Sequence, residues 1–177
     1  MLVKHYCLAL FLGLTASAFA QNHNVVRWHQ IVGVITAPGV DNPVGGIPDG
    51  NGGKTNVIHA GAGPWTTRGG SAHVDLSTGE GAFNVEGLSL NGGNATGTPG
   101  PINSVVGTLV CNPGLANQAI LDTDATDLSK GGNAALSFRL SVPSGCVNPV
   151  FLIRIPQAAL RWIAAGAILD AGSSSNY

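Results

Sequence analysis

The clearest group of possible metal ligands is an acidic run formed by Asp122, Asp124 and Asp127. Carboxylate oxygens are the ligands that calcium prefers. The spacing resembles half of an EF-hand loop, but Asp127 stands where that loop needs glycine and Asn133 where it needs glutamate. We therefore expect either a calcium site in a β-sandwich loop or a simple exposed turn.

Other polar side chains give weaker candidates. Asp41 and Asp49, with Asn51, form a second possible calcium group. Ser71, His73 and Asp75 would share one side of a strand, but they match no nucleophile motif, and a solvated strand face is the simpler explanation. The four histidines after residue 20 show neither HxH nor HExxH spacing. We therefore predict that the protein is not an enzyme, and a hydrolase is the least favoured reading.

Two residues are candidates for contacts with sugars. Trp65 follows Pro64 in a glycine-rich stretch, so it could stack on a carbohydrate or pack beneath a loop. Asn94-Ala95-Thr96 is a glycosylation sequon on an expected loop. A bound or attached glycan is therefore a possible partner.

The first twenty residues have the pattern of a secretory signal peptide. A basic start at Lys4 and His5 precedes an apolar run over residues 7–15, and Ala18-Phe19-Ala20 forms a small-x-small cleavage site. The apolar run is shorter than the 18 or so residues of a membrane anchor. We expect a secreted protein, extracellular or at the cell surface, with no membrane contact after cleavage.

Cleavage at residue 20 would leave two cysteines, Cys111 and Cys146. An even pair in an exported chain most simply forms a disulfide. Closing a loop of about 36 residues should stabilise the fold by roughly 4 kcal/mol.

The composition excludes several classes of protein. The 177 residues include 26 Gly and 10 Pro, and only 10% are charged, against about 25% in ordinary domains. Such a chain is not a coiled coil or a bundle of long helices. A net charge of −1 offers no basic surface for nucleic acid.

Apolar residues recur at every second position, which is typical of strands with one buried face. The pattern is clear over residues 136–142 and 71–76, and residues 105–111 and 150–155 are continuously apolar, as in central strands. Residues 160–168 predict a last strand rather than a helix. A phase slip at Gly87 predicts a β-bulge. We expect an all-β antiparallel sandwich or jelly roll of about eight to ten short strands.

The strand after the leader is the most unusual feature. Residues 25–35 alternate, and we place Val26, Trp28, Val32 and Val34 on one side, with Ile31 on the other. Residues 38–63, rich in Gly and Pro, predict a long surface loop with a short strand at 56–59. Such a loop would let the N-terminal strand complete the sheet of its own chain or enter the sheet of a neighbouring chain. Donation of this strand from each chain to the next yields fibres. The organisation is thus a leader (1–20), an N-terminal strand (21–37) and a sandwich domain (38–177).

Several segments resemble a group of uncharacterised exported β-sandwich proteins of environmental bacteria. The matching segments are GVITAPG at 33–39, PWTT at 64–67, GGSA at 69–72, VDLSTG at 74–79, GTLVC at 107–111, FLIRI at 151–155 and RWIA at 161–164. The resemblance brings no activity with it. The general plan is also similar to extracellular fibre subunits joined by strand donation. It departs from chaperone–usher pilins, because Tyr177 follows a Ser/Asn tail rather than an apolar final strand.

Two functions follow from these features. The first is a non-enzymatic subunit of an extracellular fibre, a helical homopolymer in which residues 25–35 join one copy to the next. The alternative is a secreted monomeric module that binds carbohydrate at Trp65 or calcium at the acidic run.

Overall fold

The computed structural model describes residues 24–36, 40–61 and 63–171, and their regular secondary structure is β-strand apart from one short 3-10 turn. Eight strands form one antiparallel sheet in the order β10-β6-β5-β1-β12-β11-β8-β9. They are β1 (Val25–Gly33), β5 (Gly69–Asp75), β6 (Glu80–Glu86), β8 (Ser104–Cys111), β9 (Ala119–Asp127), β10 (Ala134–Arg139), β11 (Val150–Ile155) and β12 (Arg161–Ala171). The all-β antiparallel class and the last strand are thereby confirmed.

Two small sheets complete the fold. One is the hairpin of β2 (Val44–Pro48) and β3 (Lys54–Ile58), and the other pairs β4 (Trp65–Thr66) with β7 (Ser89–Leu90). A single 3-10 turn, η1 (Pro156–Ala158), joins β11 to β12. The hairpin corrects our prediction of a long loop over residues 38–63, although β3 overlaps the short strand expected at 56–59. The sequence did not indicate the first strand of the hairpin, because two glycines, Gly45 and Gly46, interrupt the apolar pattern.

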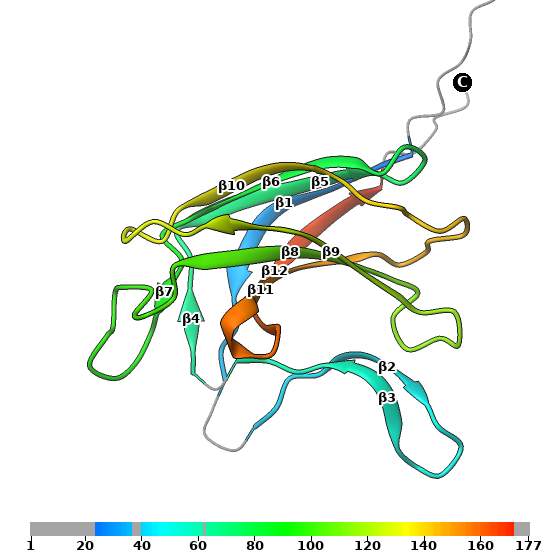
Figure 1. The fold of residues 1–177 in the computed structure, drawn as a ribbon, viewed down its shortest axis with the longest axis horizontal. Helices are drawn as coiled ribbons and strands as arrows, with labels where there is room; N and C mark the ends of the chain where they lie inside the picture. The colour runs from blue at the N-terminus through cyan, green and yellow to red at the C-terminus, as the bar shows by residue number, and fades with distance from the viewer. Residues whose placement is uncertain (1–23, 37–39, 62, 172–177) are drawn as a thin grey trace, which may run out of the picture.

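The large sheet bends so that its two halves face each other, as in a sandwich (Figure 1). Aromatic rings fill the space between the halves: Phe151 of β11 lies 5.6 Å from both Phe83 of β6 and Trp28 of β1, measured between ring centroids. Gly107 of β8 makes room for this cluster, because a Cβ there would lie 2.8 Å from Phe83 and 2.9 Å from Phe151. Side chains from strands far apart in sequence therefore form one core.

The edge strands β9 and β10 approach each other where the bent sheet nearly closes. The hydroxyl of Thr126 on β9 donates a hydrogen bond to the carbonyl of Ala135 on β10, at 3.3 Å. Unpaired sheet edges tend to recruit further strands. In this sheet the bend instead turns the two edge strands toward one another.

Burial along the strands follows the expected periods. In β5, Ala72 and Val74 are buried whereas Ser71 and His73 are exposed. The strands β8 and β11 are buried almost throughout, as their continuous apolar runs predicted. The predicted bulge at Gly87 was wrong. Strand β6 ends at Glu86, and the next residue, Gly87, has φ +61°. Leu88 then donates its backbone N–H to the carbonyl of Gly132.

Candidate functional site

Strand β1 is the candidate assembly element. It lies inside the large sheet, with β12 along one side and β5 along the first half of the other (Figure 1). Val26, for example, pairs with Ala171 of β12 and with Val74 of β5. In the single chain, therefore, β1 completes its own sheet between β5 and β12.

The inward side chains of β1 are fully buried. Val26, Trp28 and Ile31 are 3%, 2% and 1% exposed. The indole of Trp28 covers Gly166 of β12, where an added Cβ would lie only 2.5 Å from the indole Cγ. Phe151 supports the other part of the ring at a centroid distance of 5.6 Å. Glycine at position 166 thus provides the space that the largest side chain of β1 fills.

Our assignment of the β1 faces was partly wrong. Val26, Trp28 and Val34 are buried as expected, but Val32 is 46% exposed and Ile31 is buried in its place. The inward alternation slips by one residue between Trp28 and Ile31. This slip lies opposite Ile168, whose positive φ (56°) interrupts the regular pleat of β12. Part of the cause is therefore on the partner strand and is not visible in β1 alone.

The chain leaving β1 is anchored at both ends of residues 35–43. The backbone N–H of Val34 donates to Ile163, and its carbonyl accepts from the N–H of Trp65, at 2.8 and 2.7 Å. Farther on, the carbonyl of Asn42 accepts a hydrogen bond from the indole N–H of Trp162 at 2.8 Å. These contacts tie Val34 and Asn42, which lie on either side of the connection, to β12 and β4.

Asp41 provides a further anchor in the same connection. Its carboxylate is hydrogen-bonded to the His59 ring and accepts from the backbone N–H of Ala60 at 3.2 Å. The His59 bond lowers the pKa of Asp41, and the Ala60 bond and the charges of His59 and Arg161 lower it further, while burial acts the other way. Asp41 therefore stays charged and keeps its partners across the neutral range.

The acidic run lies in strand β9, which corrects the expectation of a turn. Asp122 accepts hydrogen bonds from Arg154 at 2.9 Å and from the hydroxyl of Thr108 at 2.6 Å. Within residues 24–36, 40–61 and 63–171, no three His, Cys, Asp or Glu side chains gather closely enough to hold a metal. The partners of Asp122 are thus a threonine hydroxyl and an arginine.

Arg154 is a buried charged residue that the sequence did not single out. It is 8% exposed, and its Nε donates to the carbonyl of Leu160 at 2.5 Å while Nη1 donates to Asp122. The five-residue apolar run FLIRI hides it, because an arginine inside a buried strand carries no motif. It links β11, β9 and the turn before β12.

The weaker calcium group is not assembled either. Asp49 accepts from the backbone N–H groups of Asn51 and Gly53, both at 2.9 Å, and so shapes the β2–β3 turn. Asp41 is engaged with His59 instead. The two carboxylates therefore serve separate local structures.

The polar cluster on β5 divides between two sets of partners. The Ser71 hydroxyl donates to Asn84 at 2.7 Å, and Asp75 accepts from the backbone and hydroxyl of Ser77 in the following turn. Neither bond involves His73. Ser71 and Asp75 thus each have a hydrogen-bond partner outside the cluster.

The two sugar candidates lie in different surroundings. Trp65 is 4% exposed, so its ring offers little open face for stacking on a carbohydrate, and the exposure on which that prediction depended is absent. Its buried packing agrees with the alternative we kept open. Asn94 is exposed in the turn-rich segment between β7 and β8, where the sequon was expected to lie.

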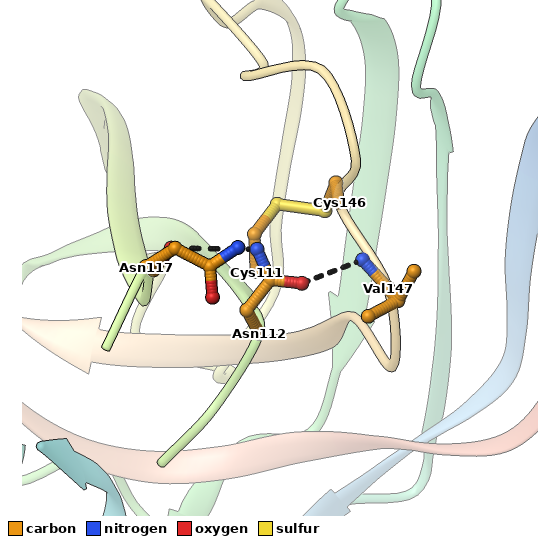
Figure 2. The surroundings of a disulfide bond; sticks show 5 residues. All are labelled: Cys111, Asn112, Asn117, Cys146 and Val147. Atoms are coloured by element: carbon orange, nitrogen blue, oxygen red, sulfur yellow. Dashed lines mark hydrogen bonds between the residues drawn. A yellow bond between two sulfur atoms is a disulfide. The ribbon is translucent and has the colours of Figure 1, made fainter. Parts of the chain in front are cut away.

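The disulfide joins Cys111, at the end of β8, to Cys146, shortly before β11, with Cα atoms 4.9 Å apart, as predicted (Figure 2). The neighbouring Asn112 accepts a hydrogen bond from the backbone of Val147 at 2.9 Å and donates to the carbonyl of Asn117 at 3.3 Å. Asn112 is 2% exposed and has φ +54°. Its side chain therefore reinforces the same connection as the disulfide.

No protein-family model, curated protein or solved structure matches this chain. In the described residues there is no helix with the length and apolar character that crossing a bilayer requires. The leader predicted over residues 1–20 lies outside the described residues.

Proposed function

We propose that this chain is a non-enzymatic structural subunit of an extracellular or cell-surface fibre, and that exchange of β1 between neighbouring copies builds the fibre. The observation that carries the proposal is the place of β1. It is the first strand of the described residues, yet it lies between β5 and β12 with its inward side chains buried. Withdrawing it would leave a groove that the same strand of another copy fits.

The fit of β1 into that groove is specific. Trp28 occupies the space above Gly166, and Ile31 pairs with Gly166 across the strands. A shifted register would bring the indole against a residue with a side chain. The groove therefore selects one register, which repeated addition of identical subunits requires.

The connection to β2 is long enough for exchange. Nine residues, 35–43, separate Val34 from the start of β2 at Val44. Fully extended, a segment of this length spans about 30 Å, which is comparable to the width of a small domain. Exchange would break the bonds of Asp41 and Asn42 and could re-form them in the same geometry with the neighbour.

Apolar side chains on the outer side of β1 and β12 also favour contact between copies. Four large ones are strongly exposed there or directly beyond β1: Val32 (46%), Ile35 (81%), Ile168 (62%) and Leu169 (47%). A neighbouring subunit would remove them from water. With only 10% charged residues, the chain also has little charge repulsion to oppose such packing.

Engineered cysteines test the exchange directly. Val32 and Ala165 pair across β1 and β12, so Val32→Cys chains mixed with Ala165→Cys chains and refolded together should form covalent dimers on oxidation. Ser71→Cys mixed with Asn84→Cys is the matched control, because β5 and β6 stay in one chain and should not cross-link between chains. Non-reducing gels separate the species, and negative-stain microscopy should show fibres of the mature protein.

The opposite result would favour the secreted monomeric module that binds carbohydrate or calcium. A Val32→Cys/Ala165→Cys double variant that closes only within one chain, together with a monomer at high concentration, would refute the fibre function.

A further inference from the structure

A pocket of about 570 Å³ opens beside the small β4–β7 sheet, at the end where β11 passes into β12. Its walls include Trp65, Leu90, Ile102, Ile155, Ala159 and Arg161. Small-molecule sites commonly measure about 300–1,000 Å³ and are mostly apolar. The pocket therefore has the size and the lining of a small-molecule site.

The pocket carries one charged side chain, Arg161. Its Nη1 donates to the carbonyl of Ala60 at 2.7 Å, which fixes the guanidinium and leaves other N–H groups for a second acceptor. No acidic residue is among the described residues that line the pocket. Asp41 is close enough for its charge to interact with Arg161, but it is hydrogen-bonded to His59 and does not line the pocket.

The turn that presents Arg161 has an unusual backbone. Ala159 and Leu160 both adopt positive φ, at 51° and 54°, although neither is glycine. Buried Arg154 holds the turn by donating to the carbonyl of Leu160 at 2.5 Å, and Asp122 fixes Arg154 in turn. Backbone strain that the surroundings maintain is frequent at ligand sites. Here it places Ala159 and Arg161 on the same pocket wall.

We propose that this pocket binds an amphipathic carboxylate with an apolar body of the size of a medium-chain fatty acid. The hydrocarbon would lie against the partly buried Leu90 and Ile102, where it displaces water from apolar walls. The carboxylate would accept hydrogen bonds from the free N–H groups of Arg161, a strong charge-assisted contact. The scarcity of polar side chains disfavours a sugar. The inference is independent of the fibre function.

Calorimetric titration of the mature protein with decanoate tests the site, with decan-1-ol as the uncharged probe. We expect one molecule of decanoate per chain. Arg161→Gln should weaken decanoate binding about tenfold and leave decan-1-ol binding unchanged, since only the acid uses the guanidinium. Arg68→Gln, which removes an arginine that does not line this pocket, is the matched control and should bind as the wild type does.

A second pair of variants fills the apolar part. Leu90→Trp and Ile102→Trp should each abolish binding of both probes, and an unchanged thermal transition identifies the variant that folds normally. Absence of decanoate binding to the wild type would overturn the proposal, as would equal binding to Arg161→Gln. If Leu90→Trp changes the sedimentation of the protein but not decanoate binding, the pocket is a contact between copies and the proposal is wrong. None of these results alters the cysteine cross-linking that tests the fibre function.

Discussion

Gly166→Ala is a direct test of how closely β1 fits the sheet. The new Cβ would lie 2.5 Å from both Cγ and Cδ1 of Trp28 and 2.9 Å from its Cβ. Carbon atoms in contact are usually about 3.5–4.0 Å apart, so the indole must move by about 1 Å. The contact with the Trp28 Cβ limits escape by side-chain rotation, because that atom moves only with the backbone. The substitution must therefore push β1 and β12 apart.

The surroundings of Trp28 make this movement costly. The side chain is 2% exposed and packs against Phe151. Overpacking a close-packed core costs about 1–3 kcal/mol, and we expect about 3 kcal/mol here because backbone must shift. For a protein of this size the melting temperature should fall by roughly 6–12 °C.

The measurement is equilibrium unfolding in urea, followed by tryptophan fluorescence with the disulfide intact, together with thermal melting. Gly69→Ala is the control, because a Cβ on Gly69 meets nothing within 4 Å. It should change the free energy of unfolding by less than about 0.5 kcal/mol. A Gly166→Ala protein as stable as this control would refute the close fit.

A double variant separates overpacking from a general loss of structure. Trp28→Leu removes the ring that meets the new methyl group and by itself leaves a cavity. The double variant Trp28→Leu/Gly166→Ala should lose at least about 1 kcal/mol less free energy of unfolding than the two single variants together, because the new methyl group partly fills the cavity. Additive costs would contradict contact between these two positions.

Three further predictions concern the disulfide and the charged pairs. Replacing Cys111 and Cys146 together by serine should lower the free energy of unfolding by about 4 kcal/mol, measured in urea, and no change would indicate that the bond is absent in solution. Arg154→Ala should lower the free energy of unfolding by about 3 kcal/mol, because it leaves Asp122 without its largely buried arginine partner. Arg139→Ala breaks an exposed pair with Glu80 and should cost less than about 0.5 kcal/mol in the same assay. Asp41→Asn should cost no more than about 1 kcal/mol at neutral pH, because the pair with His59 is half exposed. Since the folded pKa of Asp41 is lowered, this difference should persist above the ordinary value of 3.8 and disappear as the pH falls through the folded pKa; a difference that survives in acid would exclude the carboxylate as its source.

The strands were predictable where their pattern is local. The alternation over residues 136–142 overlaps β10, which spans Ala134–Arg139, and the apolar run at 150–155 coincides with β11. Both patterns are local, because strand residues face alternate sides of a sheet or, in central strands, lie inside the core. The disulfide was predictable because residues 1–20 read as a leader, which leaves two cysteines.

The remaining features depend on distant parts of the chain. The reversed orientation of Ile31 and Val32 lies opposite Ile168, more than a hundred residues away in the sequence. The pocket beside Trp65 collects side chains from segments separated by up to a hundred residues, so no window of sequence contains it. Local sequence pattern thus predicts the strands, whereas the pocket depends on how distant strands and loops pack together.

The disulfide has a consequence for the rim of the sheet. Cys111 and Cys146 enclose residues 112–145, and this segment includes both edge strands, β9 and β10. The two edges that meet at the near-closure of the sheet therefore belong to one covalent ring. If thermal motion separates them, neither can drift far from the other or from the core strand β8. Separation of β9 from β10 therefore stays small and reversible and does not lead to pairing with strands of other molecules.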